Sequence, residues 1–304
     1  MKRNFLCLMA CSLLVFSCHD NENDIDLPDD RPTQEISGRD ARITPQSFNN
    51  IQLKDLPASF EIDESVTAGE VRITSDSDMD GEIDYYVENG ELHLEGREAD
   101  GVVIYTNPDN VRKLEVRGNN DVYLAGTPVL DYLEIVTKGN SVLTMDEMRV
   151  KNLVTRREGG SKMYLSSEVD DPEADTLFWD EGDVMIVNDN FVIYTDNDID
   201  YLLYSPVVEV RDGQVFVYNN SGDDRKRYFL TQKHELRNQG SSYADAFDLP
   251  ALRVISRNLG NSESNVWAVD YLEVEGVGNS VLNYMGNPVT ELDLKGQATV
   301  NKVN

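Results

Sequence analysis

The segment Asp76–Asp84 carries the residue types of a calcium-binding loop. Carboxylates stand at loop positions 1, 3 and 5, glycine at 6 and an apolar residue at 8. Position 12, where the loop needs a bidentate glutamate, is Val87, and Glu88 comes one place late. The alternative is an acidic turn between strands predicted at Val71–Thr74 and Ile83–Val87. The turn is the favoured interpretation, so no metal ligand is assigned and no cofactor is expected.

Histidine chemistry has little support. The chain contains three histidines. His19 lies near the N-terminus, His93 alternates with Leu92 and Leu94 and is expected on the solvent face of a strand, and His234 sits in a charged stretch. A catalytic triad or a histidine-based metal site needs an imidazole held by its neighbours, and the spacing singles none out. We assign no catalytic residue.

Sugar chemistry leaves an alternative open. With 56 acidic residues, carboxylate pairs of the glycosidase kind arise by chance. Arg156–Arg157 or Arg225–Arg227 could serve as the base of a polysaccharide lyase, although no motif supports either pair. Trp179, Trp267 and exposed tyrosines could stack on sugar rings, but both tryptophans fall where a strand expects apolar residues, which favours packing in the core.

All three cysteines lie within the first eighteen residues. Lys2 and Arg3 precede the apolar run Phe5–Phe16, which has the length of a secretory signal and is too short to span a bilayer. The run closes on Val-Phe-Ser-Cys18, the pattern of a lipidation site. Cys11 also fits this pattern but leaves too short an apolar run. We therefore predict a lipoprotein signal peptide over residues 1–18, anchored through Cys18, and a mature chain without disulfides.

Acidic and proline residues dominate residues 19–40, which predicts a flexible tether before one domain at 41–304. The net charge is −29, and it becomes 25 − 56 = −31 without Lys2 and Arg3. Such a surface repels nucleic acid, which is not expected as a partner. An acidic cluster directly after the lipidated cysteine resembles the signal that sends lipoproteins of Bacteroidota to the outer face of the outer membrane. The predicted location is thus the outer membrane at the cell surface, and the alternative is a plain linker on a periplasmic protein.

The rest of the chain repeats one pattern: a short alternating strand, a Gly/Asn/Ser turn and a second short strand. Glycine adopts the positive φ of such turns cheaply. The pattern predicts an all-β fold, a parallel β-helix (β-solenoid) with coils of about 20 residues, because stacked coils place like residues on like. An antiparallel sandwich is the alternative. Residues 189–265 read as irregular, with long loops at 219–227 and 239–246. The repeats begin at Leu114, Leu133, Leu153, Leu177, Val208, Leu252, Leu272 and Leu292.

Three segments resemble the auto-transporter adhesin head GIN domain family of Bacteroidota. They are the opening Phe48–Ile51, the predicted hairpin within Val71–Leu94, and the closing turns of 272–296 with Tyr284-Met-Gly-Asn-Pro288. The resemblance implies a pectin-lyase-like β-helix over 41–304, no known enzymatic residues and a role in adhesion.

The expected function is therefore that of a non-enzymatic surface lipoprotein that binds a glycan or a surface protein of a host or bacterium. It is held on the membrane by its lipid and is a possible homo-oligomer. The alternatives are a carbohydrate-active enzyme on the same scaffold and a structural component of the envelope.

Overall fold

The computed structural model describes residues 33–45, 47–96, 101–125, 128–169, 177–180, 184–188, 191–196, 199–204, 207–211, 214–218 and 227–303. This part of the chain is all-β, with one short 3-10 helix, η1 (Pro108–Asn110). None of its helices is long and apolar enough to cross a membrane. The predicted anchor at Cys18 lies outside the described residues.

Twenty strands form one large mixed sheet, and eight more form two small antiparallel sheets. The large sheet contains β1 (Gln34–Glu35), β2 (Asp40–Ile43), β3 (Asn50–Lys54), β4 (Ala58–Ile62), β5 (Val71–Thr74), β6 (Ile83–Glu88), β7 (Glu91–Gly96), β8 (Val103–Thr106), β9 (Lys113–Arg117), β10 (Asp121–Ala125), β11 (Leu130–Thr137), β12 (Val142–Asp146), β13 (Val150–Arg157), β14 (Lys162–Ser166), β23 (Thr231–Gly240), β24 (Tyr243–Gly260), β25 (Glu263–Gly278), β26 (Val281–Met285), β27 (Val289–Gly296) and β28 (Thr299–Lys302). The small sheets contain β15 (Glu168–Val169), β16 (Leu177–Asp180), β17 (Val184–Asn188), β18 (Phe191–Asp196), β19 (Ile199–Tyr204), β20 (Val207–Arg211), β21 (Gln214–Tyr218) and β22 (Arg227–Phe229).

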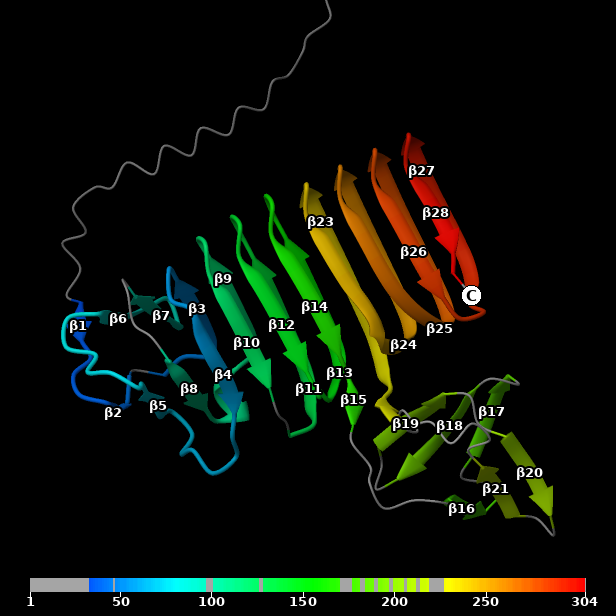
Figure 1. Ribbon diagram of the computed structural model, residues 1–304, viewed down its shortest axis with the longest axis horizontal. Helices are drawn as coiled ribbons and strands as arrows, with labels where there is room; N and C mark the ends of the chain where they lie inside the picture. Colours follow the sequence, from blue (N-terminus) through cyan, green and yellow to red (C-terminus); the bar gives the residue numbers. More distant parts are fainter. Residues whose placement is uncertain are drawn as a thin grey trace, which may run out of the picture. The chain divides into compact units, whose positions relative to one another are not determined.

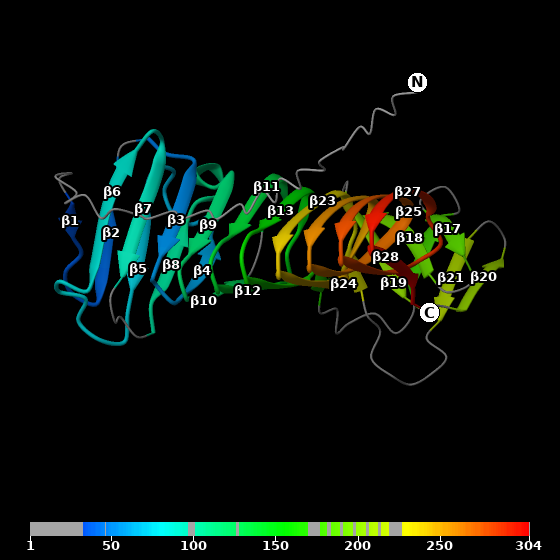
Figure 2. The same ribbon diagram turned by 90° about the horizontal axis from the view of Figure 1, so that it is seen from above.

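Two parallel ladders run through the large sheet (Figures 1 and 2). The first joins β3, β9, β11, β13, β23, β24, β25 and β27. The second joins β4, β10, β12, β14, β24, β25, β26 and β28. From β9 to β14, and again from β26 to β28, consecutive strands along the chain lie in alternate ladders. The long strands β24 and β25 belong to both ladders, one half of each strand to each ladder.

The N-terminal strands are paired differently. β1 pairs antiparallel with β6, β2 with β5, β5 with β8 and β6 with β7. The sheet is therefore mixed, where the sequence predicted parallel coils throughout. Pairing also begins before residue 41, since Gln34 lies opposite Tyr85 and Ile36 is buried.

The repeats predicted at Leu177 and Val208 do not belong to the ladders. β16, which starts at Leu177, pairs antiparallel with β21, and β20, which contains Val208, pairs with the same strand. The chain leaves the first ladder after β13 and returns at β23, with Leu153 opposite His234. Alternation and a glycine turn also describe an ordinary hairpin, which explains the wrong assignment of Val208, since β20 and β21 form one. The two strands predicted at Leu177 became β16 and β17, which belong to different sheets.

The predicted irregular segment 189–265 is likewise only partly irregular. The regular strands β23 and β24 occupy most of residues 231–260, and the predicted loop 239–246 belongs to these strands except for the tight turn at 241–242. The predicted loop 219–227 falls, except for Arg227, outside the described residues.

The repeats differ slightly in length. Leu133 lies opposite Leu153, as the repeat predicted. Leu114 lies opposite Ile135, whereas the repeat had placed Leu133 opposite it. That repeat is therefore longer than the next one, and the predicted alignment was out of register by two positions. The error arises because a shift of two positions keeps every side chain on its own face and still places an apolar residue on an apolar residue.

The turn glycines stack directly on one another. Gly139, Gly159, Gly240, Gly260, Gly278 and Gly296 each have positive φ and lie above the backbone of the preceding turn. The residue after each glycine donates its N–H to the carbonyl of the glycine below, for example Asn140 to Gly118 at 3.0 Å and Gly160 to Gly139 at 2.9 Å. A Cβ on Gly139 would lie 2.6 Å from the Gly118 carbonyl oxygen. Glycine is thus required both by its φ and by the close approach of two backbones.

Gly139→Ala is expected to lower the free energy of unfolding by about 1–3 kcal/mol more than Gly90→Ala, because only the first creates a backbone clash. Both glycines have nearly the same φ, +76° and +77°, but nothing lies within 4 Å of a Cβ on Gly90. Gly90→Ala therefore isolates the cost of positive φ, about 1–2 kcal/mol. Urea unfolding of both variants tests this, and equal losses would show that stacking of the turns does not restrict residue 139.

Candidate functional site

One row of outward side chains crosses the second ladder in strict register. Tyr123 of β10 lies opposite Thr144 of β12, which lies opposite Tyr164 of β14. Both tyrosines are well exposed, at 41% and 38%. The polar row, as we call this set, consists of Ser59, Tyr123, Thr144, Tyr164, Asp245, Asn265, Asn283 and Asn301. Because parallel strands lie about 4.8 Å apart, the row is a regular linear array.

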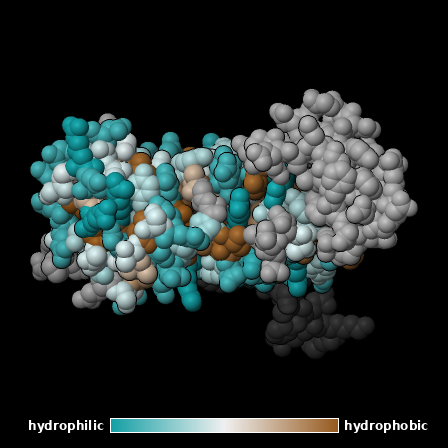
Figure 3. Space-filling view, turned by 90° about the horizontal axis from the view of Figure 1, so that it is seen from below, coloured by the Kyte–Doolittle hydropathy of each residue, from teal (hydrophilic) through white to brown (hydrophobic). Residues whose placement is uncertain are grey.

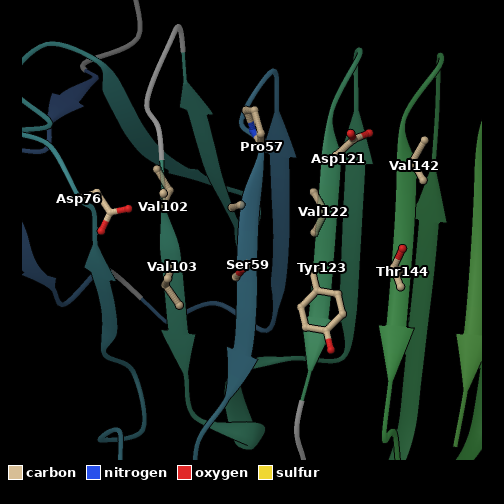
Figure 4. Close-up of a pocket in the computed structure, with 12 residues that line it drawn as sticks. Pro57, Ser59, Asp76, Val102, Val103, Asp121, Val122, Tyr123, Val142 and Thr144 are labelled. Carbon is tan, nitrogen blue, oxygen red and sulfur yellow. The ribbon is translucent and has the colours of Figure 1, made fainter.

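A groove of about 550 Å³ lies at the N-terminal end of the polar row (Figure 4). Strands β8, β4, β10 and β12 form its floor, and Ser59, Tyr123 and Thr144 line it. Asp76 and Asp121 add two carboxylates. The Tyr123 hydroxyl lies 3.5 Å from Asp146 Oδ2. Burial, followed by the nearby Asp146 carboxylate, raises the pKa of Tyr123.

A second aromatic position lies further along the row, where Tyr164 and Tyr243 are 5.9 Å apart between ring centroids. The Tyr243 hydroxyl donates to Asp245 Oδ2 at 3.2 Å and accepts from Asn265 Nδ2 at 3.1 Å. Burial, followed by the Asp245 carboxylate, raises the pKa of Tyr243 to about 12. The phenol thus keeps its proton and its ring is held in place.

Three asparagines continue the row to the last strand. Asn283 Nδ2 donates to Asn265 Oδ1 at 2.9 Å, and Asn301 Nδ2 donates to Asn283 Oδ1 at 3.1 Å. Together with Tyr243 they form a chain of hydrogen bonds that ends on Asp245. Such chains fix the amide orientations and leave a rigid polar surface.

This arrangement suits binding of a polyhydroxylated ligand. Tyrosine rings offer apolar faces at low entropic cost, and carboxylates and amides accept or donate hydrogen bonds beside them. Another face of the described surface is mostly hydrophilic with small apolar areas, as the acidic composition implies (Figure 3). Sequence reasoning named exposed tyrosines only as a class. Only the pairing register of the strands shows that Tyr123 and Tyr164 lie in one row.

Two carboxylates of the candidate calcium loop accept hydrogen bonds from the backbone of a neighbouring segment. Gly38 donates its N–H to both Asp78 Oδ1 and Asp80 Oδ1 at 3.1 Å. Asp76 lies apart from them, with its carboxylate against the backbone of Gly101. Among the described residues, no group of three or more His, Cys, Asp or Glu side chains could hold a metal ion.

The two described histidines differ from each other. His93, expected on the solvent face, stacks on Tyr86 with centroids 4.4 Å apart and is largely covered. His234 is fully buried, with Nε2 3.1 Å from Thr155 Oγ1. Burial and the nearby positive charge of Arg157 lower the pKa of His234 to about 3. His234 sits in a charged stretch of the sequence, and strand alternation turns its side chain inward.

The candidate lyase arginines separate as well. Arg156 faces outward and lies 3.1 Å from Glu134, whereas Arg157 is buried and its Nε donates to Asn238 Oδ1 at 2.7 Å. Burial lowers the pKa of Arg157 to about 9. Arg227 stacks over the Tyr201 ring at 3.9 Å, and Arg225 is outside the described residues. Arg156, Arg157 and Arg227 are not among the described residues that line the groove of Figure 4.

Trp267 is buried, as predicted, and meets Tyr228 edge to face at 5.3 Å. Trp179 belongs to β16, whose side chains are outside the described part of the chain.

Residues 47–177 match the family described as "Putative auto-transporter adhesin, head GIN domain". The resemblance stated from sequence is therefore confirmed over this segment, and the closing turns at 272–296 lie beyond it. No curated protein matches the sequence.

Several solved structures have a similar fold. A putative adhesin from Bacteroides fragilis NCTC 9343 has a TM-score of 0.57 at 14% identity, and one from Parabacteroides distasonis ATCC 8503 has 0.53 at 13%. A putative lipid binding protein from Parabacteroides distasonis ATCC 8503 has 0.50 at 12%. Each comparison covers 90% of this chain and 98% of the other. At these identities the likeness shows a shared fold.

His234→Leu is expected to remove a pH dependence of stability. The folded pKa of about 3 lies below the unfolded value of 6.5, so the unfolded chain binds the proton first as the pH falls. Below pH 6.5 this destabilises the wild type by about 1.4 kcal/mol per pH unit, and the loss levels off near pH 3. Leucine suits the site, since Leu153 and Val254 lie opposite it. Urea unfolding of both proteins between pH 7 and 4 measures the difference, and parallel curves would contradict the burial of a neutral imidazole.

Proposed function

We propose that the protein is a non-enzymatic, lipid-anchored adhesin of the outer membrane that presents the polar row to a glycan at the cell surface. The parallel ladders are taken to wind as a β-helix, with the polar row on one of its faces. The observation that carries the proposal is the in-register array of Tyr123, Thr144 and Tyr164 beside the groove.

Three kinds of support converge on a glycan. Two exposed tyrosines, 41% and 38% accessible, offer ring faces for the C–H faces of pyranose rings. Asp121 and Thr144 lie in the same groove and can bond hydroxyls. A linear array also matches a linear polymer, since successive strands present polar side chains at a regular spacing. The family matched by residues 47–177 and the titles of two similar structures agree with adhesion.

The net charge of −29 favours a neutral or basic partner over anionic lipid or nucleic acid. This charge argues against a lipid ligand of anionic type, although one similar structure is titled a lipid binding protein.

Tyr123→Ala and Tyr164→Ala are each expected to weaken glycan binding about fivefold to tenfold through loss of a stacking face. Tyr132→Ala is the matched control, because Tyr132 is equally exposed, at 42%, but lies on the first ladder. The purified full-length chain is screened on an array of neutral and acidic oligosaccharides, and the best ligand is titrated by calorimetry. Equal losses in all three variants would place the binding site elsewhere.

Mass analysis of the bound oligosaccharide decides between adhesin and enzyme. An intact ligand supports the adhesin. Shortened or unsaturated products would establish the carbohydrate-active alternative and overturn the non-enzymatic proposal.

Cys18→Ser is expected to move the protein from the membrane fraction to the soluble fraction, because acyl chains supply the anchor. Cys11→Ser is the control and should remain in the membrane, since its cysteine precedes the proposed cleavage site. Cell fractionation and mass spectrometry of the mature N-terminus measure this. Protease digestion of the wild type on intact cells then separates an outward from a periplasmic location.

A further inference from the structure

The two ladders end in β27 and β28, whose outer edges have no partner strand in the described part of the chain (Figure 1). β27 pairs in parallel with β25, and β28 with β26. All eight residues of β27 are exposed. A strand edge of this kind carries a row of free N–H and C=O groups and is a template for a further strand.

The same end exposes side chains that belong to the core. In the ladder register Leu292 lies over Val274 and Leu294 over Gly276, which are inward positions. Val274 is only 2% exposed, whereas Leu292 is 49% and Leu294 is 38% exposed. Val300 of β28 lies over the buried Leu282 and adds to the apolar area. The difference arises because none of the described strands covers β27 and β28.

We propose that this end docks a second copy of the same chain, pairing β27 with β27 and β28 with β28 across a two-fold axis. An axis parallel to the last layer, half a strand spacing outside it and at right angles to both strands, places the reversed copy of each strand beside the original. Both pairs are then antiparallel and form together, as an isologous contact requires. The inward leucines of the two copies meet and continue one core.

The sequence of β27, Val-Thr-Glu-Leu-Asp-Leu-Lys-Gly, is self-complementary in this arrangement. With Asp293 on the axis, Glu291 lies opposite Lys295 of the second copy, and this pair occurs twice. Leu292 lies opposite Leu294 of the second copy, again twice. Opposite charges and apolar residues directly across an antiparallel pair are both favourable.

One of the two nearest alternative registers is unfavourable. A shift that places Leu292 on the axis brings Glu291 opposite Asp293 of the second copy, so that like charges face each other. A shift that places Leu294 on the axis brings Asp293 opposite Lys295 but removes the pairing of Leu292 with Leu294. Glu291 is also held on the outer face, because the Tyr271 hydroxyl donates to its Oε2 at 2.6 Å. Lys295 Nζ lies 2.9 Å from Asp293 Oδ2 and offsets the charge of the two aspartates that meet at the axis.

Docking through this end has a consequence for adhesion. Along the chain, successive ladder strands run from β3 and β4 toward β27 and β28, so the N-terminal strands of two docked copies lie at opposite ends of the joined ladders. Combined with the proposed surface anchor, on which this consequence alone rests, copies on two facing cells would meet through β27 and β28.

Charge reversal tests the interface in solution. The full-length chain carries Cys7→Ser, Cys11→Ser and Cys18→Ser so that no acyl chain contributes, and its mass is followed by sedimentation equilibrium. A dimer is expected, and Glu291→Lys or Lys295→Glu alone should raise its dissociation constant about tenfold or more. Mixing the two variants should restore the dimer, because every Glu–Lys pair is re-formed between unlike copies. Glu273→Lys, the same reversal one strand earlier, is the control and should leave the dimer intact.

Asp293→Cys in the same background provides a geometric test. The two-fold axis brings this position close to itself, so mild oxidation should give a covalent dimer, whereas Asp270→Cys, exposed but away from the edge, should not. A wild-type chain that stays monomeric at about 100 µM, far above the micromolar affinity of a typical specific contact, would overturn the proposal. So would a dimer that neither charge reversal weakens. Glycan binding plays no part in these measurements, so their failure is separate from failure of the proposed function.

Discussion

Stacking of one backbone turn on the turn below is the constraint on which this structure depends. At each level the residue after the glycine donates its N–H to the glycine carbonyl beneath it, at 2.7–3.0 Å from Gly118 to Gly278. The contact leaves no room for a Cβ and fixes where each repeat begins. Once the turns are aligned, every ladder strand lies in register with the preceding strand of its ladder. Side chains therefore fall into columns, inward or outward, over the whole length of a ladder.

The columns explain both the core and the site. Inward columns place Ile51 between Leu92 and Leu114, and Leu133 on Leu153, all buried. Outward columns repeat a polar contact with the same spacing, which turns separate tyrosines and asparagines into the polar row. At the last described strands the same stacking leaves inward positions exposed, because each strand is covered only by the next strand of its ladder. The exposed Leu292 and Leu294 are core residues without a covering layer.

The repeat pattern of the sequence could predict the features that the glycine turns determine. Gly118, Gly139 and Gly159 mark turns that stack as expected, and Leu133 on Leu153 follows from them. It could not predict where the chain leaves the ladder. Leu177 and Val208 open segments with the same alternation and turn residues, and only long-range pairing shows that these segments form separate antiparallel sheets. For the site, the sequence could predict that exposed tyrosines exist but not which ones lie together. Tyr123 and Tyr164 are far apart in the sequence and become neighbours of Thr144 only through the pairing register of β10, β12 and β14.

Apolar residues alone do not fix the register in which β23 pairs with β13 after the chain has passed through the small sheets. β23 must resume pairing with β13 after a long detour through the small sheets, and a slip of one position would exchange its inward and outward faces. Polar side chains at this junction distinguish the registers. Asn238 accepts from the buried Arg157, and His234 meets Thr155, pairs that exist only when Arg157 lies opposite Asn238 and Thr155 opposite Leu236. A slipped strand would leave the Arg157 guanidinium buried without its acceptor, which costs far more than an imperfect apolar contact. The buried polar groups thus weaken the core locally but select the one register in which β23 continues the first ladder.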